Sequence, residues 1–482
     1  MDDLISVRIP FTITLPTGLP ASLTELAKGS TVNIAVTGLS RAGKTVFITS
    51  LIHNLLSAIY EPELMPLLGV ASERRLVSAK IAGAKASRLP RFPYQRNIEK
   101  MTASPPVWPQ GTTDISEIEI DIRFLPAGTL GKLLGRVSSD AATLRIKIVD
   151  YPGEWLLDLP LLTQSYAQWS RGMFKLLRRG IRAELARAYR DSLTQHPYDQ
   201  TANEEVARKA HDLYRAFLLN ARDQHGLNYL QPGRFLCPGS IGEAPYFWFA
   251  PLDIPEGVEE FPPGSLAALM QARFEVYKRE VVFKFYDDHF RQYSRQVVLV
   301  DVLSALLAGH DAFDDTRLAL DAIVESFRYG RSGILSRLLR GARIEKVLFA
   351  ATKADHIPQI QWDHLAELLR HMVAGATLEI KSSNASMDVG VLASVVSTTE
   401  GMQEIGGQQV QVVVGKPVGQ DTQRAFFAGS VPIRPPRPEA WRQPFLNVPN
   451  FEPPPIEASP VTGIAHINLD STLEYLVGDR LR

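Results

Sequence analysis

The chain has 482 residues, of which 45% are hydrophobic, enough to bury a large core in two or three domain-sized units. Lysine plus arginine equals aspartate plus glutamate at 52 each, so no global positive charge favours nucleic acid as a partner. The single cysteine excludes an internal disulfide, and neither a signal peptide nor a membrane-spanning apolar run is evident, so we expect a globular, cytoplasmic protein.

The first predicted strand, residues 32–37, runs directly into residues 38–45, which read G-L-S-R-A-G-K-T. This segment matches the G-x-x-x-x-G-K-[ST] phosphate loop, and an apolar helix over 46–59 follows it as that motif requires. Backbone N–H groups would face the phosphates, Lys44 would reach the β- and γ-phosphates, and the Thr45 hydroxyl would bind Mg²⁺. The predicted nucleotide contacts of this region are Gly38, Ser40, Arg41, Ala42, Gly43, Lys44, Thr45 and Val46.

A long, proline-rich connection over 61–111 leads to the second predicted strand, 115–124, in which apolar residues alternate with charged ones. This alternation predicts one exposed face and a position at the edge of the sheet. Just before the strand, Thr112 and Thr113 are both candidates for a switch threonine that ligates Mg²⁺. Trp108 is a candidate cover for the nucleotide, although burial in a core is the commoner fate of tryptophan.

The third predicted strand, 143–149, pairs antiparallel with the second and ends in Asp150-Tyr151-Pro152-Gly153, a D-x-x-G element. A carboxylate at the end of a buried strand can hold a Mg²⁺-bound water, which makes Asp150 a metal candidate. The Gly153 N–H can meet the γ-phosphate, and such contacts often order a switch segment.

Hydrolysis needs a water in line with the γ-phosphate, and many GTPases orient it with a glutamine directly after D-x-x-G. Here the residue is Glu154, so we expect slow intrinsic turnover, or a role for Glu154 as an N-cap or ion-pair partner. Arg41 can supply positive charge to the transition state. Alternatively, Arg41 faces solvent, or it holds Glu154 away from the phosphates. The catalytic candidates are therefore Lys44, Arg41, Glu154 and Gly153.

About 135 residues, from 156 to 291, separate the D-x-x-G element from the next core strand, far more than a crossover requires. We expect a helical inserted domain there, with helices over 203–226 and 266–290. Because it begins just after Gly153, this insertion is placed to respond to the γ-phosphate and to bind an effector protein.

Within the insertion, Arg171 to Arg190 carries seven basic residues and an apolar stripe at helical spacing. The pattern is typical of a basic amphipathic helix that contacts an anionic membrane surface or an acidic partner. The alternative is a solvated helix whose stripe packs inside its own bundle.

Strands over 295–303 and 345–351, with a helix through 315–328 between them, continue the core. The second strand ends in Thr352-Lys353-Ala354-Asp355, the [NT]-K-x-D signature of GTP-binding proteins. Asp355 can accept hydrogen bonds from the ring N–H and exocyclic amine of guanine, a donor pair that adenine lacks. The Lys353 stem would lie along the base.

The last core strand is predicted over 391–397, and the loop that follows it can present backbone N–H groups to the guanine oxygen. The candidates for this contact are Val396 and Ser397. Alternatively, this segment is an ordinary strand end with no role in binding. Further on, a short strand over 409–414 precedes ten prolines between residues 431 and 460.

The proline-rich segment is predicted to wrap on the core as extended chain, since Trp441, Phe445 and Phe451 are interspersed in it. A ligand for a proline-binding domain is the alternative. A short helix over 470–477, capped by Asp470, ends the predicted elements.

The sequence resembles the YcjX-like family of P-loop proteins, bacterial stress proteins classed as predicted ATPases or GTPases. The resemblance rests on the three motifs above and on further matches at Trp108-Pro109, Ile115 to Ile118 and Arg295 to Asp301. It implies a bacterial, cytoplasmic protein with a GTPase-like core and a large helical insertion. It also favours Thr112 as the switch threonine and adds His356 to the nucleotide contacts.

These features predict an α/β fold of the P-loop, GTPase-like class, with a mixed, mostly parallel sheet flanked by helices. The expected division is an N-terminal extension (1–29), two core halves (30–155 and 292–402), the helical insertion (156–291) and a β and proline-rich extension (403–482). The expected function is Mg²⁺-dependent hydrolysis of GTP to GDP, whose nucleotide state switches the insertion, in a stress response. A P-loop ATPase and a nucleotide-stabilised scaffold with little hydrolysis are the alternatives.

Overall fold

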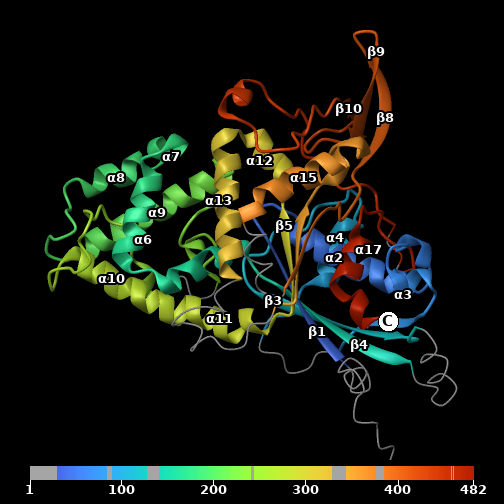
Figure 1. The fold of residues 1–482 in the computed structure, drawn as a ribbon, viewed down its shortest axis with the longest axis horizontal. Coiled ribbons are helices and arrows are strands. Elements are labelled where there is room, and N and C mark those ends of the chain that lie inside the picture. The colour runs from blue at the N-terminus through green and yellow to red at the C-terminus, as the bar shows by residue number, and fades with distance from the viewer. Residues whose placement is uncertain are drawn as a thin grey trace, which may run out of the picture.

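The computed structural model describes residues 30–83, 89–127, 141–239, 244–327, 344–375, 385–457, 459 and 461–482, so the predicted extension 1–29 lies outside the described residues. In the described part of the chain, seven strands form one sheet in the order β2-β3-β4-β1-β5-β6-β7 (Figure 1). The strands are β1 (Ser30–Gly38), β2 (Leu76–Ile81), β3 (Ser116–Phe124), β4 (Ala142–Asp150), β5 (Arg295–Val300), β6 (Lys346–Ala351) and β7 (Ser386–Val391).

The neighbouring strands β4, β1, β5, β6 and β7 run parallel to one another. Strand β3 pairs antiparallel with both of its neighbours, β2 and β4. This confirms the predicted α/β class with a mixed, mostly parallel sheet, and it confirms the antiparallel pairing of the second and third predicted strands. The carboxyl ends of β1, β5, β6 and β7 share one edge of the sheet, where ligands of such folds bind.

The predicted edge position of β3 is wrong, because β2, from the long connection after the first helix, hydrogen-bonds to its outer side. The alternating charges are instead satisfied by ion pairs on one face of the sheet. Glu117 pairs with Lys147 at 2.5 Å, and Asp121 with Arg145 at 2.6 Å. A charged face of a strand therefore reflects cross-strand pairing here and carries no information about an edge.

Alternating residues of β5 supply both hydrophobic layers of the core. Val297 and Leu299 belong to a cluster on the face covered by helices from the first half of the chain and by the C-terminal helix. Val298 and Val300 belong to a larger cluster on the opposite face, which continues into the insertion. The helices of the first face are α2 (Lys44–Ser57), α3 (Gly69–Ser72), α4 (Tyr94–Met101) and α17 (Leu469–Val477).

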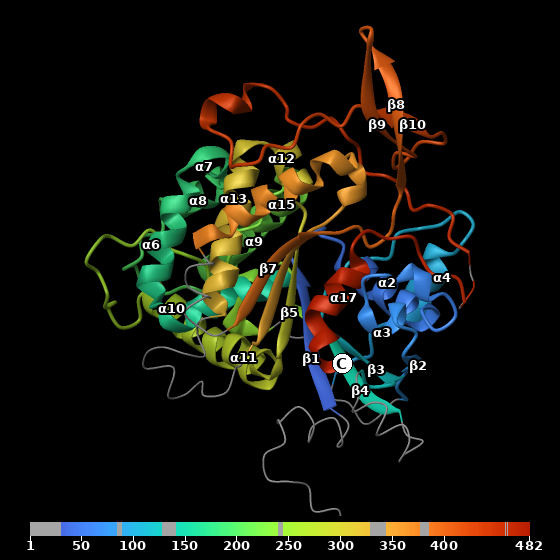
Figure 2. The same ribbon diagram turned by 45° about the vertical axis from the view of Figure 1, so that its right-hand side comes forward.

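Three helices of the second core half, together with the insertion, cover the other face (Figures 1 and 2). These three are α12 (Val302–Ala308), α13 (His310–Ser326) and α15 (Trp362–Met372). The segments of the insertion are η2 (Gly153–Thr163), α6 (Tyr166–Leu177), α7 (Gly180–Leu185), α8 (Arg187–Leu193), α9 (Glu204–His225), α10 (Leu266–Tyr277), a π-helical turn η6 (Lys278–Phe283) and α11 (Lys284–Asp288). The two long helices predicted in the insertion are thus present.

The basic stretch predicted as one helix is divided among α6, α7 and α8, and its apolar stripe packs inside the protein. Phe174 and Leu177 are buried in the larger hydrophobic cluster. Three of the arginines are held by ion pairs, Arg171 with Glu259, Arg178 with Asp253 at 2.5 Å and Arg182 with Asp315. The bundle interpretation of this stretch is confirmed. Among the described helices, none combines the length and the apolar character needed to cross a membrane.

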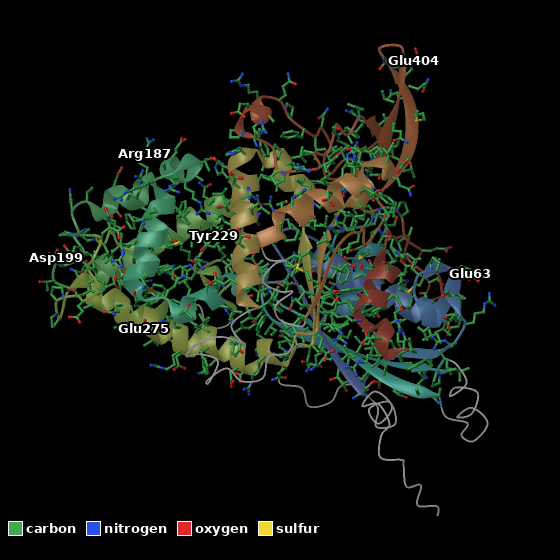
Figure 3. The ribbon with its side chains drawn as sticks, viewed as in Figure 1. Glu63, Arg187, Asp199, Tyr229, Glu275 and Glu404 are labelled. Atoms are coloured by element: carbon green, nitrogen blue, oxygen red, sulfur yellow. The ribbon has the colours of Figure 1, made fainter. Side chains whose placement is uncertain are left out.

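A second, antiparallel sheet follows the core. It consists of β8 (Thr398–Ile405), β9 (Gln408–Gly415) and β10 (Arg424–Phe426). The strand predicted over 409–414 is its central strand, and its two partner strands were not predicted. The β8–β9 hairpin projects away from the rest of the molecule, with Glu404 near its tip (Figure 3). The strand predicted over 391–397 was placed too late, because β7 already ends at Val391 and the apolar residues after it are buried in a loop.

Most of the described proline-rich segment lies on the core without helix, as predicted, and Phe451 is buried. The exception is the 3-10 helix η10 (Pro438–Arg442), which the sequence did not predict. We call residues 446–456 the C-terminal strap. Helix α17 begins at Leu469 and packs beside α2 and α3 (Figure 2). The predicted cap is wrong, because the Asp470 carboxylate accepts the backbone N–H of Leu67, which joins this helix to the first half of the chain.

Candidate functional site

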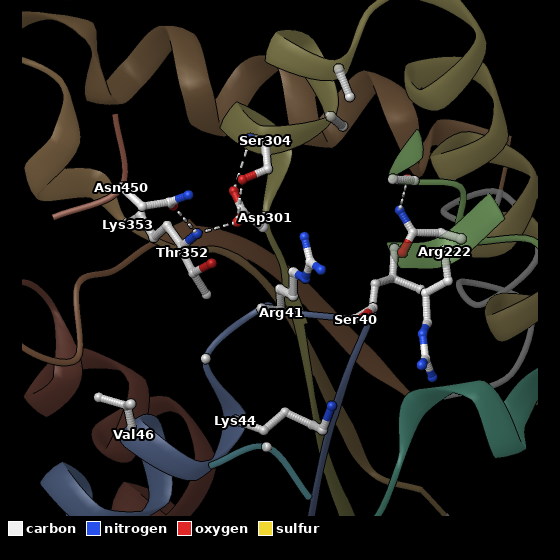
Figure 4. A pocket seen from close by; sticks show the side chains of 18 of the residues that line it. Ser40, Arg41, Lys44, Val46, Arg222, Asp301, Ser304, Thr352, Lys353 and Asn450 are labelled. Carbon is white, nitrogen blue, oxygen red and sulfur yellow. Dashed lines mark hydrogen bonds and ion pairs between the residues drawn. The ribbon is translucent and has the colours of Figure 1, made fainter. Parts of the chain in front are cut away.

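A cavity of about 1130 Å³ lies at the carboxyl ends of the parallel strands (Figure 4). Several regions distant in sequence line it. They include residues 39–46 of the predicted phosphate loop and α2, the segment from Trp108 to Thr113, Glu154, the end of α9 with Cys237, the loops after β5, β6 and β7, and the C-terminal strap. The three predicted motifs therefore meet around one cavity.

The predicted phosphate loop curls tightly between β1 and α2. Arg41 and Gly43 adopt left-handed backbone conformations, with φ of 63° and 83°. Helix α2 begins at Lys44, so the N–H groups of its first turn lack intrahelical partners and point their dipoles into the cavity. The Lys44 ammonium donates to the Gly38 carbonyl at 3.1 Å, across the mouth of the loop. The arrangement suits an anion with several phosphate groups.

The D-x-x-G glycine lies directly against this loop. A Cβ atom on Gly153 would be 2.1 Å from the Gly38 carbonyl oxygen, closer than any side chain tolerates. Because the obstacle is backbone, no side-chain movement can relieve it. Only glycine at position 153 lets the two motifs touch.

Two hydroxyls and one carboxylate converge beside the loop. The Thr45 and Thr112 hydroxyls are 3.2 Å apart, and Thr112 donates to Asp150 Oδ2. Burial raises the pKa of Asp150 to about 6, against the opposing effects of Lys44 and Thr112. Its second oxygen, Oδ1, is buried without a hydrogen-bond partner.

Hard oxygen donors of this kind, with an unsatisfied carboxylate oxygen, fit Mg²⁺. Within the described residues no group of three or more His, Cys, Asp or Glu side chains suits a metal. A magnesium ion here would therefore need phosphate oxygens and waters in addition to Thr45, Thr112 and Asp150. Thr113 is exposed, so the geometry brings the neighbouring Thr112 into this group.

The segment after Gly153 is held by residues 231–237, which we call the insertion loop. Gly233 donates to Asp158 at 2.7 Å, and a Cβ atom on Gly233 would lie 1.9 Å from the Glu154 carbonyl oxygen. The Trp155 indole donates to the Cys237 carbonyl at 3.0 Å. The Arg234 guanidinium lies over the Trp155 ring, 3.1 Å from its centre. The D-x-x-G segment and the insertion thus form one packed unit.

The last turn of α9 forms the wall beside the predicted phosphate loop. Arg41 donates to the Asp223 carbonyl at 3.2 Å. Arg222 makes two hydrogen bonds to the Asp223 carboxylate, at 2.8 and 3.2 Å. Glu154 is buried in the same wall and lies within electrostatic reach of Arg222. Sequence reasoning missed both α9 residues, because no local motif marks them.

At the other end of the cavity, Lys353 follows β6 in a left-handed conformation. Its ammonium pairs with Asp301 at 2.5 Å and donates to the Asn450 side chain at 3.2 Å (Figure 4). Burial alone would raise the pKa of Asp301, but Lys353 and two hydrogen bonds from Ser304 hold it below its usual value. The position of Asp301 at the carboxyl end of a strand was the signal that could have identified it.

Asp355 is buried beside Lys353, and the loop after β7 holds its carboxylate. Ser397 donates to Asp355 Oδ2 through its backbone N–H at 2.9 Å and through its hydroxyl at 2.7 Å. The Val396 N–H instead donates to the Ala465 carbonyl at 2.9 Å, so the structure does not bring it into the cavity. Ser397 lines the cavity as expected.

The strap closes this end of the cavity. The His356 ring meets the Phe451 ring edge-on, with centres 4.9 Å apart. Trp108 lines the cavity, donates to the Phe451 carbonyl at 2.9 Å and, like Val46, packs against a small hydrophobic cluster. Sequence reasoning placed the strap on the core but missed Asn450 and Phe451 as residues of the site.

Comparisons with known proteins support one relationship. The YcjX-like family, DUF463, matches this chain over residues 32–481. A protein of Escherichia coli (strain K12) named Ras-like GTPase YcjX is 37% identical over 462 residues, which cover 94% of this chain and 96% of that protein. A protein of the same name from Shewanella oneidensis (strain MR-1) is 36% identical over 467 residues, which cover 93% of this chain and 94% of that protein.

Proposed function

The chain belongs to the YcjX-like family, as its motifs indicated, and on that premise we propose that it binds GTP and hydrolyses it to GDP and phosphate. The observation that carries the proposal is the meeting of three motifs around one cavity. The phosphate loop, Gly153 with Asp150, and Lys353 with Asp355 all line it or touch its lining residues.

Selectivity for guanine would come from Asp355. The two hydrogen bonds from Ser397 fix one carboxylate oxygen and so orient the group toward the base. Guanine offers two donors to such a carboxylate, whereas adenine would leave a buried charge unpaired. Lys353, held by Asp301 and Asn450, would lay its stem along the base.

Magnesium would be held by Thr45 and Thr112, with Asp150 accepting from a bound water. When bound, the ion supplies positive charge to the β- and γ-phosphate oxygens. Lys44 would donate to the same phosphates once released from the Gly38 carbonyl, and the Gly153 N–H would meet the γ-phosphate. Glu154 in place of a water-orienting glutamine is the reason to expect slow turnover.

The insertion would act as the switched element. Because the insertion loop grips the residues that follow Gly153, a change of position at the γ-phosphate is passed directly to the insertion. We propose that an effector protein reads this change, and that the domain division expected from the sequence corresponds to a switch core with a responding insertion.

Nucleotide competition tests the proposal. Unlabelled GTP, GDP, ATP and XTP compete with a fluorescent guanine nucleotide in the presence of Mg²⁺, for the wild type and Asp355→Asn. In the wild type we expect GTP and GDP to displace the fluorescent nucleotide at lower concentrations than ATP or XTP does. In the variant we expect the preference to move toward XTP. Asp363→Asn, an exposed carboxylate on α15, is the matched control. Equal competition by ATP, with an indifferent variant, would instead indicate an ATPase.

A further inference from the structure

Arg222 enters the cavity from the insertion, far in sequence from any of the motifs. It lies in the last turn of α9, and its side chain is directed into the cavity that also holds Lys44 (Figure 4). Only 18% of the side chain is exposed, whereas Arg41 of the phosphate loop is an exposed residue. A guanidinium removed from water interacts more strongly with a nearby anion than an exposed one does.

The surroundings of Arg222 place it at the phosphate end of the cavity. Arg222 Nη1 lies 3.9 Å from the Cys237 sulfur, and the Trp155 indole, which follows Glu154, donates to the Cys237 carbonyl at 3.0 Å. Glu154, Arg222, Cys237 and Lys44 all line the cavity. Glu154 directly follows the glycine that contacts the phosphate loop. Arg222 is therefore on the γ-phosphate side of Lys44, and away from the base end at Asp355.

The guanidinium is oriented but not saturated. Its Nε and Nη2 atoms donate to the Asp223 carboxylate, which fixes the plane of the group. Its Nη1 atom donates to the Cys237 sulfur at 3.9 Å, and sulfur is a weak acceptor. Donor capacity thus remains on the part of the group that a phosphate would meet.

We propose that Arg222 is a catalytic residue that donates to the γ-phosphate and to the oxygen bridging the β- and γ-phosphates; this assignment rests on the proposed GTP hydrolysis. In that reaction a water oxygen bonds to the γ-phosphorus while the bond from the γ-phosphorus to the bridging oxygen breaks. The bridging oxygen keeps the electron pair and becomes a terminal oxygen of GDP, and the water proton leaves on the released phosphate or to solvent. Arg222 stabilises the charge that grows on the bridging oxygen.

Arg41 and Asp223 act as positioning residues in this arrangement. Arg41 donates to the Asp223 carbonyl, and the Asp223 carboxylate holds Arg222, so the phosphate loop and the arginine are connected through one residue of α9. The insertion therefore supplies within the chain the charge that other GTPases receive from a separate activating protein.

Single-turnover hydrolysis of GTP by the full chain, with Mg²⁺, tests the assignment in wild type and Arg222→Ala. We expect a loss of about 10³-fold in the rate, with GDP affinity changed less than about threefold. GDP with aluminium fluoride, which mimics the transition state, should form a stable complex with the wild type and not with the variant. Arg208→Ala, an exposed arginine earlier on α9, is the matched control. If Arg222→Ala does not fold, Arg222→Gln and Arg222→Lys carry the same expectation.

The outcomes separate the assignment from the proposed function. Slow turnover with intact GDP binding and no aluminium fluoride complex supports a catalytic Arg222. Wild-type turnover in Arg222→Ala overturns the assignment and leaves GTP hydrolysis standing. Equal losses of GDP affinity and of the hydrolysis rate show that Arg222 has a structural role, and they overturn the catalytic assignment as well. A wild type that binds GTP without any turnover overturns both.

Discussion

The two ends of the cavity are built from different kinds of contact. At the phosphate end, Gly38 of the phosphate loop meets Gly153 through backbone atoms, with no side chain between them. At the base end, side chains from distant segments hold the key groups. Ser397 is 42 residues from Asp355, and Asn450 is 97 residues from Lys353.

This difference teaches which changes each end can tolerate. A backbone contact cannot be rebuilt by another side chain, so we expect a substitution at the contact between Gly153 and Gly38 to have the largest effect on activity. Contacts between side chains are individually worth about 1 kcal/mol, so changes at the base end should alter affinity or selectivity by degrees. Four predictions test the contrast, beginning with the largest expected effect.

Gly153→Ala should reduce GTP hydrolysis at least about 100-fold, because the added methyl group must push the two motifs apart. Single-turnover kinetics and nucleotide affinity measure the effect. Gly172→Ala on α6 is the control, since a Cβ atom there meets nothing within 4 Å. An active Gly153→Ala enzyme would show that the contact between the loops is adjustable.

Asp158, behind the phosphate end, should make stability depend on pH. Burial raises its pKa to about 6, above the ordinary value of 3.8, so the folded state holds this proton more tightly than the unfolded state. Its contribution to stability is thus fully present below pH 3.8 and is lost as pH rises through about 6, a change of roughly 3 kcal/mol.

Melting temperatures of the wild type and Asp158→Asn, measured from pH 4.5 to 7.5, test this assignment. The variant cannot ionise, so its melting temperature should rise relative to that of the wild type as pH increases. A constant difference across the range would mean that Asp158 does not titrate in the folded protein.

Thr112→Val should weaken Mg²⁺-dependent binding of GTP by about 10- to 100-fold, because it removes the hydroxyl that contacts both Thr45 and Asp150. Titration of nucleotide affinity against Mg²⁺ measures the loss. Thr113→Val, at the exposed neighbouring position, should leave the titration unchanged. The reverse result would identify Thr113 as the ligand.

Asn450→Ala should have the smallest effect, a reduction of about threefold in nucleotide affinity with hydrolysis preserved. Lys353 loses one hydrogen-bond acceptor but keeps its ion pair with Asp301. Equilibrium binding of GDP measures the change, with Asn447→Ala, an exposed residue of the same strap, as control. A loss as large as that of Gly153→Ala would remove the contrast between the two ends.

The same contrast explains what the sequence could predict. The phosphate loop and the D-x-x-G element are local, because their geometry depends on adjacent residues and on the strands that carry them. The fold class followed from apolar strands such as β5 and β6. The β3 edge position was wrong because β2, an unremarkable segment of the connection, pairs with it only in the folded chain.

Residues that reach the site from elsewhere had no local signal. Arg222 is one of many charged residues on a long helix, and only the docking of the insertion brings it to the cavity. The cap predicted at Asp470 failed for a similar reason, since a distant N–H, that of Leu67, takes its carboxylate. Such partners depend on tertiary structure, which propensity and spacing do not encode.

The continuity of the larger hydrophobic cluster has a thermodynamic consequence. It runs without interruption from Trp169 and Phe274 in the insertion to Val298 and Phe349 in the sheet. The described parts of the insertion and core therefore share buried surface that neither can lose alone, and they should melt in a single cooperative heat-absorption peak. A nucleotide bound between them would raise the temperature of that shared peak, so helices that never touch the ligand would gain heat resistance from it.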